Sequence, residues 1–503
     1  MCRLKQSYAL LVAGLLLLCS CASSVSPTAA PLRYAKLLRM TDAPDHTWVE
    51  ILNPWDTTQV LRQYLLVNQA MSSVAAKALQ AQHPASVLLH TPLQRTLPQS
   101  TVHASLALRL EAQQSLVGLC DTAYIVAPEL KELHLPDFGR GDQPNLERIL
   151  AVQTDVCLFA PLERIIAAKT QACLFAPFEN ARYESLERAQ IPIVDCADYL
   201  ETSPLGRAEW MRFYGRLWGK SQLADSLFAC EVRSYERLKQ MVHSTLEQTT
   251  SSGLAHPTPS GASQRENHPK MQSTSIAKIA VDTPNVGGHK KNLRRNPKNV
   301  GDFSKNVGDF PKNVGENFEN VGDNFDNLRE KENPVHKAIA SRGEKSSVPP
   351  QTTACHSHRA PRVWLDLPWQ STWYAPGGHS YLATLIADAG GDYPLRHNDQ
   401  AGSLPLPLER AWQYAQTADV WIIKGGEELP PNYAALTALS HVYAQFPAVR
   451  SHRVWVCPTM QVPYYEHTPF APTQLLREWS IMLGTLPVDA TTSLRYFHPL
   501  PRH

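Results

Sequence analysis

Short, continuous apolar runs alternate with longer segments of helical periodicity in two separate parts of the chain. The apolar runs are LVGLCD, TDVCLFAP and IPIVDC in the first part, and RVWLDL, ADVWIIKG and HRVWVCP in the second. Segments 381–389, 408–417 and 472–483 have helical spacing, and the early pair YAKLLRM and WVEILNP is typical of a hairpin. Strands that alternate with helices favour mostly parallel sheets covered on both faces. The pattern therefore predicts two α/β lobes.

A helical segment lies between the two lobes. Pro204 suits a first helical turn, with Thr202 or Ser203 as the N-cap. Apolar side chains then return at helical spacing until Gly219, at Trp210, Phe213, Tyr214 and Leu217. A second helix is predicted from Ser221 to about Met241. We expect a long interdomain helical connector over 201–243, between an N-terminal lobe at 22–200 and a C-terminal lobe at 360–503.

The composition changes sharply over 244–359, where polar residues, Gly and Pro replace the large aliphatic residues. Asn-Val-Gly recurs at seven-residue intervals, at Asn299, Asn306, Asn313 and Asn320, with an earlier copy at Asn285. This period does not predict a coiled coil, because each unit contains Gly and Asn and few large apolar residues. The segment is predicted to be a long, disordered, low-complexity insertion rather than a folded repeat module.

The N-terminus has the pattern of an export signal. Arg3 and Lys5 precede an apolar run from Tyr8 to Leu18 that is short for a membrane span. The run ends in Leu-Cys-Ser-Cys, which resembles the lipobox of bacterial lipoproteins and makes Cys21 the candidate for lipidation. Residues 1–21 are then a lipoprotein signal peptide, and the chain is anchored by its N-terminal lipid. Ordinary cleavage near Ala22 is the alternative. Because the sequence after Cys21 is uncharged, we expect retention at the periplasmic face of the inner membrane.

Composition and motifs exclude several classes of function. The formal net charge of +2 gives no reason to expect a nucleic acid partner. Seven cysteines follow Cys21 without a CxxC pair, and most lie in apolar runs, which favours buried thiols. The sequence contains no GxSxG, HExxH or phosphate-binding GxxxxGK[ST] motif. Neither an enzyme nor a cofactor is predicted.

Three longer stretches together resemble the ABC-transporter substrate-binding proteins that bind iron-siderophores, haem and cobalamin. They are ADYLETSPLGRAEWMRFYGRLWGK with the following ADSLF, GRGDQPNLERILAVQTDVCLF, and APGGHSYLATLIADAGGDYPL. The resemblance covers about 34–241 and 361–503. It implies two α/β lobes bridged by a helix, a ligand cleft between them, and delivery of an iron complex or corrinoid to an inner-membrane permease coupled to its ATPase.

The resemblance also assigns two acidic residues. Glu147 in PNLERIL and Glu409 in LPLERAW match the family's docking glutamates, each at the start of a helix that precedes a strand. A carboxylate on each lobe that pairs with Arg on each permease subunit would fix one docking orientation. The alternative is that each carboxylate only stabilises the positive N-terminal end of its helix.

A flat chelate offers apolar area with few directional contacts, so aromatic side chains in loops after strands are candidates to contact it. The candidate ligand-binding residues are Trp55, Trp369, Trp373, Tyr374, Tyr464 and Tyr465, with His103 and His379 as possible hydrogen-bonding or metal-coordinating groups. Core packing of the aromatic residues and a surface or capping role for the histidines are the alternatives. Trp210, Trp218, Trp364, Trp421 and Trp455 are assigned to packing.

Two other functions fit the same architecture. A zinc- or manganese-binding protein would need three or four His and carboxylate ligands that converge on the cleft. The His residues of the lobes are scattered in sequence, so no metal site is assigned. A lipoprotein that kept the fold as an interaction scaffold is the third possibility.

Overall fold

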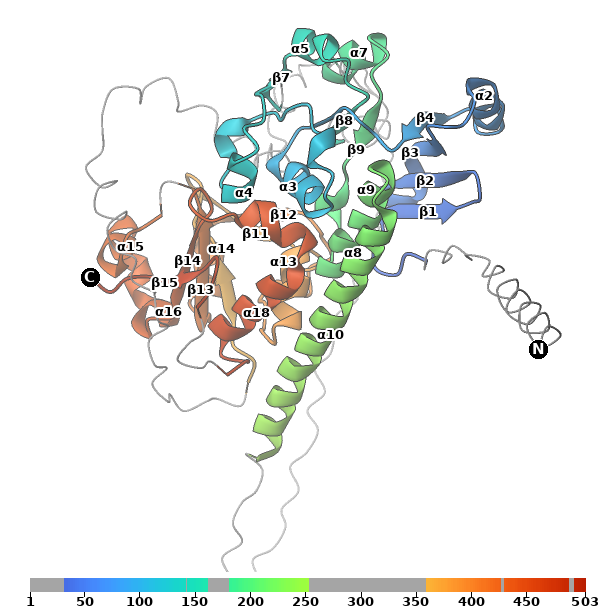
Figure 1. Ribbon diagram of the computed structural model, residues 1–503. Coiled ribbons are helices and arrows are strands. Elements are labelled where there is room, and N and C mark those ends of the chain that lie inside the picture. Colours follow the sequence, from blue (N-terminus) through green and yellow to red (C-terminus); the bar gives the residue numbers. More distant parts are fainter. Residues whose placement is uncertain (1–30, 142, 162–180, 253–358, 427–428, 488–492) are drawn as a thin grey trace, which may run out of the picture.

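The computed structural model describes residues 31–141, 143–161, 181–252, 359–426, 429–487 and 493–503. Figure 1 shows an N lobe, a C lobe and a long helix, α10, that runs alongside both. The predicted signal peptide with Cys21 and most of the predicted insertion lie outside the described residues.

The N lobe contains two sheets. Strands β1 (Leu38–Asp42), β2 (His46–Asn53) and β3 (Asp56–Asn68) are antiparallel, and β4 (Ser86–Thr91) runs parallel to β3 after helix α2 (Ser73–Gln82). The predicted early hairpin is thus confirmed as β1 and β2. The second sheet is parallel, in the order β5 (Thr96–Pro98), β8 (Val156–Phe159) and β9 (Ile193–Asp195).

Short helices surround the parallel sheet of the N lobe. They are α3 (Thr101–Arg109), α4 (Pro128–Lys131), α5 (Leu146–Ala151) and α7 (Ala181–Arg188), with 3-10 turns at Gln113–Ser115, Thr122–Tyr124 and Asp198–Leu200 and a small ribbon of β6 (Gly139–Arg140) and β7 (Gln143–Pro144). The prediction of a regular strand at LVGLCD is wrong. That segment makes only isolated bridges, Leu116 with Thr96 and Leu119 with Asp137.

The connector consists of α8 (Pro204–Glu209), α9 (Met211–Leu217) and α10 (Ser221–Ser252). Ser203 is the N-cap, and its hydroxyl accepts a hydrogen bond from the Gly206 N–H at 3.0 Å. Gly219 has φ of +67°, which suits glycine and lets the chain turn from α9 into α10. Helix α10 extends well past the predicted end near Met241.

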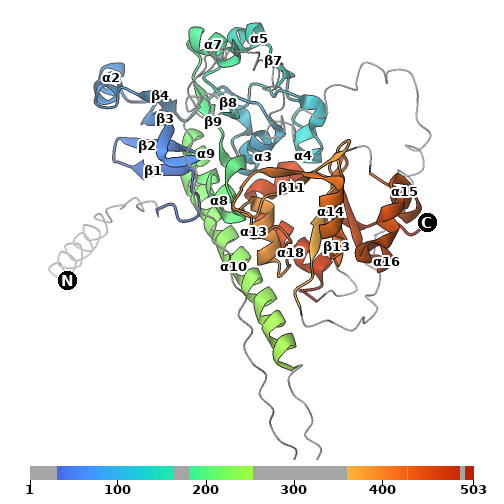
Figure 2. The same ribbon diagram turned by 180° about the vertical axis from the view of Figure 1, so that it is seen from behind.

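The C lobe has a parallel sheet with one antiparallel edge strand. Its order is β10 (Val363–Leu365), β13 (Val420–Gly425), β14 (Val454–Pro458) and β15 (His498–Pro499), with β15 antiparallel to β14. A separate ribbon pairs β11 (Thr372–Pro376) with β12 (Ser403–Pro407). The helices are α13 (Tyr381–Asp388), α14 (Leu408–Ala415), α15 (Tyr433–Leu439), α16 (Pro447–Arg450), α17 (Tyr464–His467) and α18 (Pro472–Leu483), with 3-10 turns at His441–Gln445 and Thr468–Phe470. Figure 2 shows this lobe from behind.

Each lobe has its own core, and the connector contributes to both. Trp210, Phe213 and Tyr214 are fully buried in the N-lobe core, whereas Tyr235 and Leu238 of α10 belong to the C-lobe core. The tryptophans assigned to packing, including Trp364 and Trp421, are buried. The prediction of two α/β lobes with parallel sheets and a helical connector is confirmed. Within the described ranges, no helix combines the length and the apolar character needed to cross a membrane.

Candidate functional site

The two lobes meet at the carboxyl-terminal edges of their parallel sheets. Helix α3 follows β5 in the N lobe, α17 follows β14 in the C lobe, and these two helices lie in contact. In α/β proteins the loops beyond the carboxyl ends of parallel strands form the ligand-binding edge. The boundary between the lobes is therefore the candidate functional site.

A buried carboxylate of the C lobe caps a helix of the N lobe across this boundary. Glu466 of α17 accepts hydrogen bonds from the N–H groups of Val126 at 2.9 Å and Ala127 at 2.6 Å, at the start of α4. Burial raises the pKa of Glu466, and the two N–H donors act in the opposite direction. His467 Nε2 lies 2.7 Å from Glu129 Oε1, and burial lowers the pKa of His467. These contacts join α17 to α4.

A second set of contacts seats the turn at Thr468–Phe470 against the N lobe. The Phe470 ring lies edge-on to Tyr214, with ring centroids 6.0 Å apart, and its backbone carbonyl accepts a hydrogen bond from Arg109 Nη1 at 2.8 Å. On the C-lobe side, the Thr384 hydroxyl donates to the Thr202 carbonyl at 2.8 Å, just before α8. The lobes are thus held together by side chains from both.

His103, predicted to face the ligand, lies in a buried network beneath this contact. Its Nε2 is 2.9 Å from Asp198 Oδ1, and the Tyr214 hydroxyl donates to the same oxygen at 2.9 Å. Although burial opposes the charged imidazole, Cys196 and Asp198 raise the pKa of His103 to about 10. Burial opposes ionisation of Asp198 as well, but His103 lowers the pKa of Asp198 to about 2. The ligand contact predicted for His103 is corrected, because both ring nitrogens are satisfied internally: Nδ1 lies 3.2 Å from the Ser100 hydroxyl.

On the C-lobe side, charged and aromatic groups follow the strand ends. Asp366 directly follows β10, and both its carboxylate oxygens lie 2.8 Å from Nζ of Lys424 in β13. Trp369, three residues further along, is 51% exposed, and Tyr465 of α17 is 41% exposed. These two of the predicted aromatic residues are therefore partly exposed to solvent at or near the carboxyl edge of the sheet.

Two other predicted aromatic contacts are part of the core. Trp373 is fully buried beside Trp364 and Trp421, and its indole N–H donates to the Leu365 carbonyl at 2.9 Å. Tyr464 is 5% exposed and packs edge-on against Tyr496. Both ligand predictions are corrected, because these rings fill space inside the lobe rather than facing outward.

The other three predicted ligand residues lie on a ribbon, before a helix and in a hairpin turn. Tyr374 is half-buried on β11, and His379 is exposed just before α13. The glycines before His379 do not open space for a ligand. A Cβ on Gly377 would lie 2.1 Å from the Gln400 carbonyl oxygen, so the close approach is to the chain's own backbone. Trp55 is 48% exposed in the turn between β2 and β3, on the antiparallel sheet rather than the parallel one.

The two predicted docking residues occupy matching positions in the two lobes. Glu147 is exposed in the first turn of α5, and Glu409 is exposed in the first turn of α14. Each helix leads into a strand of its parallel sheet, β8 and β13 respectively. Both carboxylates are therefore accessible to a partner, although each also lies at the favourable end of a helix.

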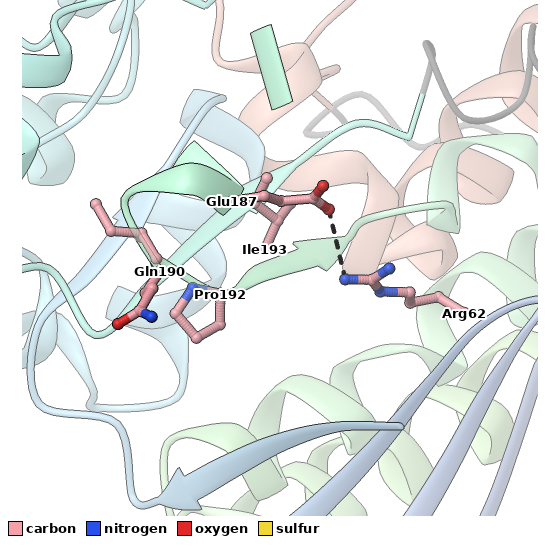
Figure 3. A pocket seen from close by; sticks show the side chains of 6 residues that line it. Arg62, Glu187, Gln190, Pro192 and Ile193 are labelled. Carbon is pink, nitrogen blue, oxygen red and sulfur yellow. Dashed lines mark ion pairs between the residues drawn. The ribbon is translucent and has the colours of Figure 1, made fainter. Parts of the chain in front are cut away.

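A separate depression lies in the N lobe, away from the carboxyl edge. It lies between Arg62 and the segment that leads into the amino end of β9 (Figure 3). Its volume is about 370 Å³. Its lining is Arg62, Glu187, Gln190, Ile191, Pro192 and Ile193, and Arg62 pairs with Glu187 at 3.6 Å. The depression lies at the opposite end of the sheet from the lobe boundary, so it is a weaker candidate. In the part of the chain that the structure describes, no three or more His, Cys, Asp or Glu side chains are grouped as metal ligands.

Several solved structures are similar to this chain. A periplasmic haem-binding protein from Pseudomonas aeruginosa is 13% identical with a TM-score of 0.43, over 79% of this chain and 95% of that one. An Fe3+-hydroxamate transport system protein from Saccharomonospora viridis is 13% identical with a TM-score of 0.43, over 78% and 94%. A periplasmic binding protein from Veillonella parvula is 9% identical with a TM-score of 0.44, over 79% and 93%. No protein-family model matches the chain, and no curated protein matches its sequence.

These TM-scores lie below 0.5, and the fold described above rests on the contacts of this chain itself. The sequence analysis missed Glu466, Asp366 and Lys424 as groups of the lobe boundary. Asp366 and Lys424 could have been found from their place at the ends of apolar runs, whereas the partner of Glu466 lies more than 300 residues away in sequence.

Proposed function

We propose that the chain is the substrate-binding component of an ABC importer, which captures an iron complex or a corrinoid at the lobe boundary. The observation that carries the proposal is the meeting of the two parallel sheets at their carboxyl edges, through α3 and α17. Exposed Trp369 and Tyr465 supply apolar area for a flat ligand on the C-lobe side. The proposed role is binding and delivery, not catalysis.

The matched positions of Glu147 and Glu409 support docking on a permease. One exposed carboxylate on each lobe allows a two-point contact with basic residues, which fixes orientation as well as affinity. The permease would present the ligand path to the lobe boundary and depend on its ATPase for transport. We further propose that Cys21 carries a lipid that holds the chain at the periplasmic face of the inner membrane.

Ligand binding is tested by fluorescence titration of residues 22–503 with haem, cyanocobalamin, ferric siderophores and zinc. Saturable binding of one organic chelate is expected, with at least a severalfold weaker affinity for Trp369→Ala and Tyr465→Ala. Leu439→Ala is the matched control, because it removes an exposed apolar side chain from α15. Binding of zinc alone would favour the metal-capture function. If none of the ligands binds and the protein co-purifies with a partner other than a permease, the scaffold function would be favoured.

Docking and anchoring are tested separately. Glu147→Ala with Glu409→Ala should abolish co-purification with the cognate permease while chelate affinity and thermal stability stay unchanged. Retained co-purification would assign both carboxylates to helix stabilisation alone. Cys21→Ser should move the protein from the membrane fraction to the soluble periplasmic fraction, and an unchanged distribution would contradict the lipid anchor.

A further inference from the structure

The backbone near the start of the described chain is bound by two carboxylates of the connector. We call this segment, residues 33–37, the strap. Glu209, at the end of α8, accepts hydrogen bonds from the first three N–H groups of the strap at 2.7–3.0 Å. Glu201, just before α8, accepts from the last two at 2.9–3.0 Å. Every backbone N–H of the strap therefore donates to the connector.

Both carboxylates are buried, which makes them depend on the strap. Glu209 is fully buried and Glu201 is 2% exposed. Arg212 pairs with Glu209 at 3.3 Å, and the Trp210 indole N–H donates to Glu201 at 3.0 Å. A buried carboxylate that loses its hydrogen-bond donors is strongly unfavourable. Because lifting the strap from α8 would remove most donors of both carboxylates, the strap and the connector are held together as one unit.

Gly206 allows the strap to lie directly on α8. A Cβ at this position would lie 2.9 Å from the Tyr34 carbonyl oxygen and 3.1 Å from Glu201 Oε2. The absence of a side chain here lets the backbone of the strap approach the helix closely. In Figures 1 and 2 the start of the described chain, in blue, runs beside α8.

The strap also contacts both lobes. The Tyr34 side chain packs against the C-lobe core and the N-lobe core, and its ring lies edge-on to Phe228 of α10, with centroids 6.0 Å apart. At the other end of the strap, Leu37 is buried in the N-lobe core and directly precedes β1. The C lobe reaches the same part of the connector, where the Thr384 hydroxyl donates to the Thr202 carbonyl. The strap therefore lies where the N lobe, the C lobe and the connector meet.

We propose that the strap is a brace across the hinge, which holds the two lobes in their present arrangement. Movement of one lobe relative to the other about α8 would withdraw the Tyr34 ring from one core or break the bonds to the two carboxylates. The brace goes beyond the proposed function, because it needs no ligand. Its consequence for binding rests on that function: a lobe boundary already held in one arrangement loses less affinity to ordering when a ligand binds.

Hydrogen exchange of residues 22–503 without a ligand tests the brace. Glu209→Gln leaves one oxygen as acceptor and places an NH2 group against the N–H donors of the strap. The amides of Val126 and Ala127 report on the contact between the lobes, because they donate to Glu466 of the C lobe. In Glu209→Gln we expect both the strap amides and these two amides to exchange roughly tenfold faster, with β8 and β13 unchanged.

A control and a second variant separate the brace from general destabilisation. Glu50→Gln makes the same chemical change on β2, where the partners of Glu50 are Gln63 and Arg39, and it should change none of these rates. Tyr34→Leu keeps the backbone donors and both carboxylates but removes the ring that touches both cores. It should speed exchange at 126–127 by roughly threefold or more, again with β8 and β13 unchanged.

The outcomes decide between a brace and a segment that only ties down the end of the chain. Faster exchange at 33–37 alone, or unchanged exchange at 126–127 in Tyr34→Leu, would overturn the brace. Unchanged exchange of the strap in Glu209→Gln would overturn it as well. If Glu209→Gln also speeds exchange in β8 and β13, the whole fold is destabilised and Tyr34→Leu decides by the same criterion. No chelate enters this test, so failure of the brace leaves the proposed function standing.

Discussion

The buried pair of His103 and Asp198 leads to a prediction for Asp198→Asn, which keeps the shape of the side chain but removes its charge. The carboxylate lies 2.9 Å from His103 Nε2 and also accepts from Tyr214 and Arg207. Removing one partner of a buried charge pair typically costs about 3–5 kcal/mol. The pKa of His103 is raised from 6.5 to about 10. At 1.36 kcal/mol for each pH unit, this shift corresponds to a stabilisation of about 5 kcal/mol, which is similar to the cost of breaking the pair.

The sign of the pH dependence follows from these two shifts. Because the pKa of His103 is raised on folding, protonated His103 contributes its full stabilisation below pH 6.5. This stabilisation is lost as the pH rises toward about 10. The lowered Asp198 pKa contributes above about pH 4 and is lost as the pH falls toward about 2. The contribution is therefore greatest between about pH 4 and 6.5. It should fall from about 5 kcal/mol at pH 6 to about 1 kcal/mol at pH 9.

The assay is urea unfolding followed by tryptophan fluorescence at pH 6 and pH 9. Asp198→Asn should lower the free energy of unfolding strongly at pH 6 and much less at pH 9. Asp392→Asn is the control, because the Arg partners of Asp392 are 41% and 51% exposed and such pairs contribute less than about 1 kcal/mol. A loss below about 1 kcal/mol for Asp198→Asn, or an equal loss at both pH values, would refute the reasoning.

Three further predictions concern packing, contact between the lobes and cysteine exposure. Gly206→Ala should lower the free energy of unfolding in urea by about 1–3 kcal/mol, because the new Cβ would lie 2.9 Å from the Tyr34 carbonyl oxygen; Gly402→Ala, with open space, should not. Glu466→Gln should speed hydrogen exchange of the Val126 and Ala127 amides about tenfold at neutral pH, and unchanged rates would show that the bonds between the lobes are not stabilising. In a Cys173→Ser, Cys355→Ser background, a thiol reagent should label Cys230 in the native protein but reach buried Cys157, Cys196 and Cys457 only after unfolding; uniform labelling would contradict their burial.

The strand and connector predictions succeeded because their signals are local. Continuous apolar runs marked β8, β13 and β14, and the helix start at Pro204 with its Ser203 cap needed only neighbouring residues. The limits of this approach appear at LVGLCD, which has the composition of a strand but makes only isolated bridges. Apolar composition alone does not supply the neighbouring strand that a regular ladder requires.

The site predictions depended on contacts that the sequence does not contain. In the sequence, Trp373 follows polar residues. On β11, however, its side chain points inward with that of Ala375, while Thr372 and Tyr374 are partly exposed. His103 is buried because Asp198, 95 residues away, provides a carboxylate for it.

Hydrogen exchange of residues 22–503, with and without a saturating chelate from the binding panel, tests the central claim most directly. Ligand held between the lobes should protect amides on both sides of the boundary, at 122–127 in the N lobe and at 366–369 and 464–467 in the C lobe. Helices α2 and α15 should exchange at unchanged rates. Protection confined to one lobe, or centred on the depression beside Arg62, would contradict a ligand site at the meeting of the two sheets.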